Sequence, residues 1–583
     1  MGLYPMKKRS YRRENRRLPV KDEENKMSAS KRLTMACCAM FAAAVLVLTG
    51  CTAPNDSGRK QHVLSVYNGI SGQFVENFNP LLPTVLGSIQ GMVFEPLFAF
   101  DRLASLGTKP TPLLGKDYKF NADGTVISVT TKKNVKWSDG TAFSARDVAY
   151  TFNLIRSRPE LNTSGNAPAA KASDDTHLTL TFDRPSFTDA PTALGLTYIV
   201  PEHLWSKKAN PVTDTNKNPV GTGPMALSSF TSQSYLLKRS KTYRDADSVQ
   251  VDGVRVYSLS GNEAATNKLL AGELDWTSIF VPNIDKVLSA SPDLAYSPTG
   301  SQQVVLSTCS NADLGCTGPQ TSVAVRQAIS AAINREQVSK LAYFGKAREI
   351  SPTFALLDRD EQFIAKSERG ALPMSADIAK AKRLLEGDGW KMGADGFYAK
   401  GGESLSMSVV VISGYTDYIT SLDIIAEQLK KAGIRLVPHQ VANNDATSVQ
   451  GLGNFQLAVT GIFQGPVGDP YYVYDKYFNS KNTGRVGTSV GSNIVRFSNP
   501  IVDAAIRDAS ATDDVDAKAA AYAKIQQIIT EDLPYIPIVN NISFTEFGTA
   551  HFSGFPSENS PLAAVGPGNA PGNGVVLTYL KAK

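Results

Sequence analysis

The hydrophobic and polar positions of the chain change period along its length, which predicts both strands and helices. Residues 62–68 alternate apolar and polar side chains, as a half-buried strand does. Residues 117–138 predict a hairpin, because a turn at 121–124 separates two arms and Ile127 and Val129 share one face. Further strands are expected over 405–412, 435–441 and 574–580.

Apolar residues spaced three and four apart predict helices elsewhere. Ser144 is a good N-cap for one of them, in which Val148 and Phe152 share a face. Gly433 is a typical stop for another. The expected helices cover 77–101 (a buried segment), 145–156, 322–342, 376–386 after a cap at Ser375, and 417–432. Because strands alternate with helices, we expect α/β lobes with mixed sheets.

The N-terminal segment combines a positive region with an apolar run, as secretory signal peptides do. Residues 33–50 are mostly apolar, and the run ends in Leu-Thr-Gly before Cys51. This exit resembles the lipobox of bacterial lipoproteins, in which the Cys thiol takes a diacylglycerol and becomes the first mature residue. We expect residues 1–50 to be removed and Cys51 to carry the lipid. The hydrophilic residues 1–26 suggest a mis-assigned start, with Met27 as the true one.

The basic character of the chain belongs to this leading segment. The whole chain carries a formal charge of +6, whereas residues 1–50 hold 11 Lys and Arg against 4 Asp and Glu. The remainder has 49 basic and 50 acidic side chains and is close to neutral. No nucleic-acid partner is therefore expected. Residues 51–61 are polar and indicate a tether between lipid and body.

Two cysteines remain once the signal and the lipid site are set aside. Cys309 and Cys316 lie seven positions apart, and an exported protein meets an oxidising compartment. A local disulfide is the expected state. A metal site is the alternative, but the five His residues are scattered and none lies near this pair.

The sequence favours a binding protein over an enzyme. About 530 residues follow the signal, too many for one core, so two or three lobes are expected. Gly221-Thr222-Gly223-Pro224 lacks the lysine of a phosphate loop. No HExxH motif or paired CxxC occurs. We expect neither catalysis nor a metal.

An ordered series of short segments resembles the family 5 solute-binding proteins, the peptide-type receptors of ABC importers, over nearly all of the mature length. The segments are 78–81 (FNPL), 94–97 (FEPL), 135–141 (VKWSDGT), 144–148 (SARDV), 220–224 (VGTGP), 271–275 (AGELD), 325–329 (VRQAI), 333–336 (INRE) and 379–390. Structure explains most of these residues better than ligand contact does. Gly221 and Gly223 suit positive φ or close backbone approach, and Arg326 and Arg335 are expected to pair with carboxylates.

The resemblance implies a two-lobed periplasmic-binding-protein-like fold with mixed sheets, a hinge and an extra domain inserted in lobe I. The expected boundaries are 60–98, 210–300 and 535–583 for lobe I, 99–209 for the insert and 301–534 for lobe II. It also implies a monomer that closes around a solute and docks on a membrane permease with its ATPase. The lipid would hold the receptor at the outer face of the cytoplasmic membrane.

The resemblance leaves the solute open between peptide and sugar. Peptide-binding members use β-augmentation and an Asp that neutralises the peptide's α-amine, but that position falls near Pro466 here, and the usual Trp after Gly461 is Ile462. Asp469 takes the role only if the loop is shifted; its Asp-Pro setting more often caps a helix. The candidate ligand-binding residues are Phe463, Gln464, Asp469, Tyr471 and Tyr472.

Oligosaccharide-binding members of the family stack aromatic faces on sugar rings, and residues 552–563 loosely resemble them. Phe463, Tyr471, Tyr472 and Tyr474 are the aromatic side chains that would supply such faces. Peptide is the favoured cargo, because most members of the family bind peptides. A solute-sensing or chaperone-like receptor without transport is a further alternative.

Overall fold

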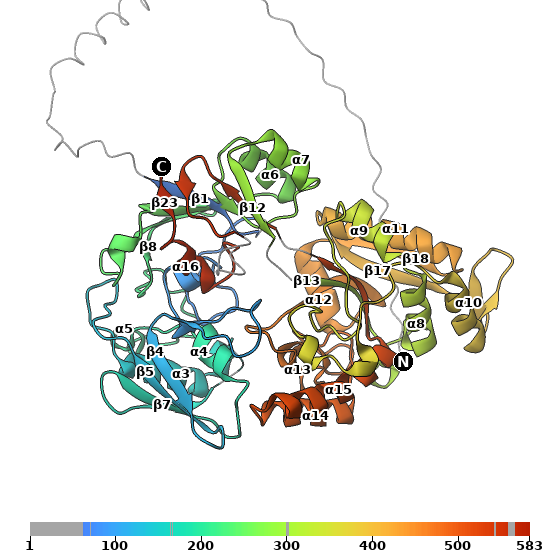
Figure 1. Cartoon of the computed structure of the whole chain (residues 1–583), viewed down its shortest axis with the longest axis horizontal. Helices are drawn as coiled ribbons and strands as arrows, with labels where there is room; N and C mark the ends of the chain where they lie inside the picture. The colour runs from blue at the N-terminus through green and yellow to red at the C-terminus, as the bar shows by residue number, and fades with distance from the viewer. Residues whose placement is uncertain are drawn as a thin grey trace, which may run out of the picture. The chain divides into compact units, whose positions relative to one another are not determined.

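The computed structural model describes residues 62–69, 72–163, 165, 167–298, 302–541, 544–557 and 566–583 (Figure 1). The expected signal peptide, the lipid site at Cys51 and the tether lie outside these ranges, and so does much of the 552–563 stretch. Among the described residues, no helix is long and apolar enough to cross a membrane.

Lobe I is built on a mixed sheet, here called the lobe I sheet. Its strand order is β12-β21-β11-β1-β10-β9-β8. The strands are β1 (Val63–Tyr67), β8 (Met225–Phe230), β9 (Ser234–Arg239), β10 (Gly253–Tyr257), β11 (Trp276–Thr277), β12 (Leu294–Pro298) and β21 (Phe544–Gly548). β1 runs parallel to β10 and β11, whereas β9 and β21 pair antiparallel to their neighbours. Helices α6 (Asn262–Leu270) and α7 (Ile284–Ala290) belong to the same lobe.

The insert forms a four-stranded antiparallel sheet with its own core. It consists of β4 (Gly115–Phe120), β5 (Val126–Thr131), β6 (Ala169–Ala172), β7 (His177–Thr181), α3 (Ala145–Ser157), α4 (Ala190–Leu196) and α5 (Glu202–Trp205). β4 and β5 confirm the predicted hairpin, and Ile127 and Val129 point into the core. The predicted cap is also present. Ser144 accepts from the Arg146 amide, and Asp147 accepts from the Ser144 amide at 2.9 Å.

Lobe II is built on a second mixed sheet, the lobe II sheet, with order β18-β17-β19-β13-β20. Its strands are β13 (Gln302–Thr308), β17 (Ser406–Ile412), β18 (Arg435–Val441), β19 (Leu457–Phe463) and β20 (Tyr535–Asn541). β17 and β18 confirm two predicted strands. β13 is antiparallel to both neighbours, and its first residue, Gln302, pairs with Phe463 on one side and with Asn541 on the other.

Helices cover both faces of the lobe II sheet (Figure 1). Side chains alternate along β13, so Val304 and Leu306 enter one core and Val305 enters the other. The first core contains α8 (Val323–Ala332), α9 (Arg335–Ala342), α10 (Ile378–Gly387) and α11 (Thr416–Lys431), and the second contains α13 (Tyr471–Phe478), α14 (Pro500–Ser510) and α15 (Val515–Asp532). Helix α12 (Asn443–Leu452) packs near the disulfide.

The chain passes between the two large sheets twice, once after β12 and once after β20. Because β20 pairs with β13, lobe II extends to residue 541. The predicted end of lobe II at 534, and the matching restart of lobe I at 535, are therefore too early by the length of this strand.

Several predicted elements differ from the structure. The helix over 322–342 is two helices, because Ile333 is extended and Asn334 starts a new cap by accepting from the Gln337 amide. Helix α10 is capped by Asp377 and not by Ser375. The predicted helix over 77–101 holds only α2 (Ile89–Met92), and the predicted final strand over 574–580 begins inside α16 (Gly572–Val576).

Candidate ligand-binding cleft

An open cavity of about 700 Å³, here called the cleft, is lined by residues of lobe I, the insert and lobe II. Lobe I contributes parts of 82–90 and 568–572. The insert side contributes Phe100, Arg102 and parts of 163–198. Lobe II contributes 463–466 and residues of α13. The volume is typical of a site for a small or extended organic ligand.

The end of β19 forms the lobe II wall of the cleft. Phe463 is the last residue of the strand, its amide donates to Tyr477 Oη at 3.1 Å, and its side chain is 52% exposed. Gln464 follows, but its carboxamide is held inside the protein: Oε1 accepts from Arg359 Nη2 at 2.8 Å, and Nε2 donates to the Phe354 carbonyl at 3.2 Å. Phe463 is therefore the more accessible of the two predicted residues.

Asp469 does not line the cleft, because its carboxylate is used within lobe II. Oδ2 forms a buried ion pair with Lys518 Nζ at 2.6 Å. Oδ1 accepts from Tyr522 Oη and, at 2.9 Å, from the Tyr471 amide. Burial and the nearby Asp469 charge raise the Tyr522 pKa well above its ordinary value. These contacts fix the loop that leads into α13.

The predicted aromatic residues divide into a lining group and a core group. Tyr472 lines the cleft, and its hydroxyl donates to the Thr188 carbonyl of the insert at 2.6 Å. Tyr471 and Tyr474 are buried in the second lobe II core. Of the five predicted ligand-binding residues, the structure brings Phe463, Gln464 and Tyr472 to the cleft.

A tight contact joins the lobe II loop to residues 101–106. A Cβ added to Gly468 would lie 2.2 Å from the Ala104 carbonyl oxygen, so only glycine allows this approach. The Arg359 guanidinium also donates to the Arg102 carbonyl. The loop after β19 is thus positioned against the insert side of the cleft.

Arg102 is a cleft residue that the sequence did not reveal. Arg102 lines the cavity, and burial lowers its pKa against the opposing effect of the nearby Asp101 charge. Among the described residues it has no ion-pair partner within 4.0 Å. It lies between short elements, β2 (Phe98–Ala99) and β3 (Thr111–Pro112), where no hydrophobic period points to it.

A smaller hollow of about 270 Å³ meets the cleft at Phe463, which lines both. Gln302 and Asn541, at the ends of β13 and β20, line it together with Asp417 near the start of α11. We call it the Asp417 hollow. From the sequence, this aspartate was predicted only as part of the helix over 417–432.

Other residues singled out in the sequence shape the lobes away from the cleft. Gly221 and Gly223 do not have positive φ; instead, an added Cβ would lie 2.0 Å and 2.4 Å from the Val93 and Met92 carbonyl oxygens. Arg326 pairs with Asp532, as expected. Arg335 was expected to pair with a carboxylate, but it donates to backbone carbonyls, including Pro537 O at 2.9 Å.

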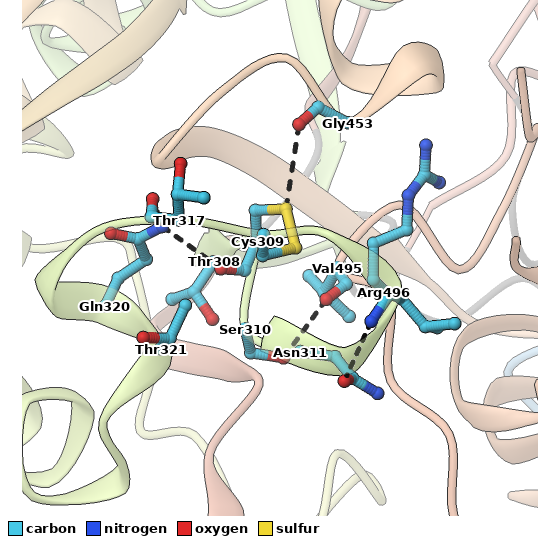
Figure 2. The surroundings of a disulfide bond; sticks show 12 residues. Thr308, Cys309, Ser310, Asn311, Thr317, Gln320, Thr321, Gly453, Val495 and Arg496 are labelled. Atoms are coloured by element: carbon cyan, nitrogen blue, oxygen red, sulfur yellow. Dashed lines mark hydrogen bonds between the residues drawn. A yellow bond between two sulfur atoms is a disulfide. The ribbon is translucent and has the colours of Figure 1, made fainter. Parts of the chain in front are cut away.

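Cys309 and Cys316 are joined by a disulfide in lobe II (Figure 2). Cys309 directly follows β13, at the end of the strand opposite to Gln302 and the cleft. Its sulfur lies 3.6 Å from the Gly453 carbonyl oxygen, and the next residue, Ser310, hydrogen-bonds to the Val495 carbonyl (Figure 2). The bond therefore closes a loop far along the sheet from the ligand wall.

Comparison with known proteins identifies a matching family and several similar proteins. Residues 109–485 match the family described as bacterial extracellular solute-binding proteins, family 5, middle. Protein XP55 of Streptomyces lividans is 26% identical over 530 residues, which cover 90% of this chain and 90% of that protein.

Two solved structures share the fold. One is a mannohexaose-bound periplasmic oligopeptide-binding protein of an oligopeptide ABC transporter from Thermotoga maritima, 22% identical, with a TM-score of 0.78 over 90% of this chain and 99% of that one. The other is the oligopeptide-binding protein AppA of Bacillus subtilis in complex with a nonapeptide, 19% identical, with a TM-score of 0.70 over 90% of this chain and 100% of that one. They confirm the predicted α/β fold of periplasmic binding proteins.

Proposed function

Because the chain belongs to the bacterial extracellular solute-binding proteins of family 5, we propose that it captures oligopeptides outside the cytoplasmic membrane and delivers them to the permease and ATPase of an ABC importer. Members of this family are binding receptors and not enzymes. We further propose that the receptor acts as a monomer anchored by a lipid on Cys51.

The observation that carries the peptide proposal is Arg102, which lines the cleft and forms no ion pair within the described part of the chain. Asp101 is close enough to raise the Arg102 pKa and Asp475 also lines the cavity, but neither forms an ion pair with Arg102. A guanidinium without such a pair can bind a carboxylate of the ligand through two parallel hydrogen bonds. A peptide carries such a carboxylate at its C-terminus, whereas a neutral oligosaccharide has none. The exposed ring of Phe463 then supplies an apolar contact for side chains.

Delivery requires the lobes to open and close around the ligand. The two passages between the sheets, after β12 and after β20, lie at the same end of the lobe II sheet, since Gln302 pairs with Asn541. We propose these passages as the hinge. Arg102 and Phe463, from different parts of the chain, then meet the ligand only in the closed form.

A second cargo, oligosaccharide, is favoured by one specific observation. Phe463 and Tyr472 place two aromatic side chains on the same wall of the cleft, and sugar rings stack on aromatic faces. The Thermotoga maritima relative holds mannohexaose although it is named an oligopeptide-binding protein. Mass spectrometry of small molecules that co-purify with the natively produced protein separates the two cargoes. Peptides are the expected result, and oligosaccharides alone would overturn the peptide proposal.

A further inference from the structure

The Asp417 hollow lies beside the cleft and is lined by both lobes. Lobe II contributes the start of α11 and the strand ends at Gln302 and Asn541. Lobe I contributes Ser278, Phe280 and neighbouring residues. Because Phe463 lines both cavities, a ligand bound in the cleft can extend a group past this ring into the hollow.

An acceptor without a hydrogen-bond partner and a buried carboxylate without a cation line this space. Asn541 is only 7% exposed, and its Oδ1 has no hydrogen-bond partner. Asp417 is 8% exposed, and within the part of the chain that the structure describes it forms no ion pair. None of the residues lining the hollow is Lys, Arg or His. A buried acceptor and a buried carboxylate both cost free energy unless something donates to them.

The backbone amides of Asp417 and Tyr418 hydrogen-bond to the Asp417 carboxylate, but these neutral donors do not supply a counter-charge. The Gln302 carboxamide donates to Tyr418 Oη at 2.7 Å. Ser421 Oγ, one turn further along α11, donates to the Asp417 backbone carbonyl and not to its carboxylate. An aspartate in the first turn of a helix is often explained by the helix dipole, but such residues are normally solvated, and this one is buried.

Aromatic rings complete the lining. Tyr415, Tyr418, Phe280 and Phe463 all contribute to the hollow, and the Tyr415 and Tyr418 rings meet edge to face with centroids 5.8 Å apart. Aromatic faces attract organic cations through their quadrupole. Carboxylate, amide oxygen and aromatic rings together form a lining that favours a positive group with N–H donors and disfavours an anion.

We propose that the Asp417 hollow is a subsite for a positively charged amino or guanidinium group of the ligand, bound by Asp417 and Asn541. This inference rests on the proposed capture of solutes in the cleft and specifies their chemistry. The hollow carries the Asp417 carboxylate, and the cleft carries Arg102 and Lys476 beside Asp475, which is paired with Lys481. The preferred ligand therefore carries both charges. The subsite is separate from the loop near Pro466, where the family's amine-binding position falls.

The pKa of Asp417 agrees with this assignment. Burial raises it to about 6, above the ordinary value of 3.8. The titratable groups around it are the Tyr343, Tyr415 and Tyr418 hydroxyls, whose pKa values are raised and which are neutral at pH 7. A ligand cation is therefore the missing counter-charge for this carboxylate.

The test uses the full-length chain in detergent and three mixtures of short random peptides with uncharged side chains. The first mixture has free N-termini, the second is Nα-acetylated, and the third is Nα-acetylated and carries one Lys per peptide. Peptides retained by the protein are quantified by mass spectrometry. D417N removes the charge at constant shape, and D423N, an exposed aspartate on the same helix, is the matched control.

We expect the wild type and D423N to retain at least one positively charged mixture roughly tenfold or more above the acetylated, uncharged one, and D417N to lose this preference. Preference for the first mixture identifies the α-amine, and preference for the third identifies a side-chain cation. Equal retention of charged and uncharged mixtures by the wild type, or an unchanged preference in D417N, would overturn the subsite alone. No retention of any mixture would overturn both the subsite and the proposed function. The wild-type comparison decides the matter even if D417N does not fold.

Discussion

The buried charge of Asp417 is proposed to favour ligand binding, but it lowers the stability of the unliganded fold. Its carboxylate is buried without a cation, so the charged form destabilises the unliganded protein. Since the folded-state pKa is about 6 and the unfolded value is near 3.8, the folded state binds the extra proton between these values. Stability therefore falls as the pH rises from about 4 to about 6 and then levels off.

D417N should remove this penalty. We expect the variant to be more stable than the wild type by up to about 3 kcal/mol at neutral pH, since each pKa unit corresponds to about 1.4 kcal/mol. Near pH 4 the two proteins should be nearly equal, because the wild-type carboxyl is then protonated in the folded state. Urea unfolding at the two pH values measures the difference. A loss of stability in D417N at neutral pH would contradict the account of an uncompensated charge.

Arg102 lines the cleft, the cavity that shares Phe463 with the Asp417 hollow, and carries the opposite charge. R102Q should weaken binding of a peptide with a free C-terminal carboxylate by roughly tenfold or more, because a partly buried guanidinium–carboxylate pair is lost. Binding of the same peptide as its C-terminal amide should change little. Fluorescence or calorimetric titration of both forms measures this, with R158Q at an exposed position as the control. Equal losses for acid and amide would show that Arg102 does not bind the carboxylate.

At the scale of elements, hydrophobic periodicity and capping residues predicted the helices and strands whose formation depends on neighbouring residues in the sequence. Helices α3 and α11 and strands β17 and β18 carry their own periodicity, caps or stops, and the structure confirms them. The break between α8 and α9 was missed because the buried stripe of Val325, Ile329, Ile333 and Val338 continues across it.

Tertiary contacts explain the elements that the pattern predicted wrongly. In the predicted helix over 77–101, the Asn79 side-chain Nδ2 instead donates to the carbonyls of Pro211 and Asp214. The predicted final strand begins in helix α16, where an added Cβ on Gly574 would lie 2.0 Å from the Gly91 carbonyl oxygen. These contacts join residues far apart in sequence, so no short window reveals them.

The same limit applies to the cleft. The segment around Phe463 could be found because the family resemblance points to the loop after β19. Arg102 and Asp417 could not, because each belongs to a different element and only the fold brings them to two cavities that share Phe463. Asp469 stood out in sequence for its Asp-Pro setting, and its contacts with Lys518 and Tyr522 show a structural use.

Gly221 fixes the approach of one element to another. In G221A the new Cβ would collide with the Val93 carbonyl oxygen, so we expect a loss of at least about 2 kcal/mol in unfolding free energy. G387A is the matched control: Gly387 ends α10, lacks positive φ and has open space around its Cβ position. That change should be neutral or stabilising by up to about 1 kcal/mol. Equal stability of G221A and wild type in chemical unfolding would contradict the close packing.

At the scale of the whole molecule, the proposed anchor and the cleft both serve delivery of the ligand to the permease. A lipid on Cys51 would confine a near-neutral receptor close to its permease and raise the effective concentration of the closed form. C51S should therefore move the protein from the membrane fraction to the medium or periplasm, while ligand binding by the purified protein stays unchanged. Cell fractionation with immunoblotting measures this. Membrane association that survives C51S would contradict a lipid anchor at this residue.

Isothermal titration calorimetry of the ligand-free protein against a peptide panel and a β-linked oligosaccharide panel tests the central claim most directly. We predict saturable binding of peptides with free termini, weakened by R102Q and D417N and unaffected by R158Q and D423N. Binding of oligosaccharides together with no binding of any peptide would contradict the account.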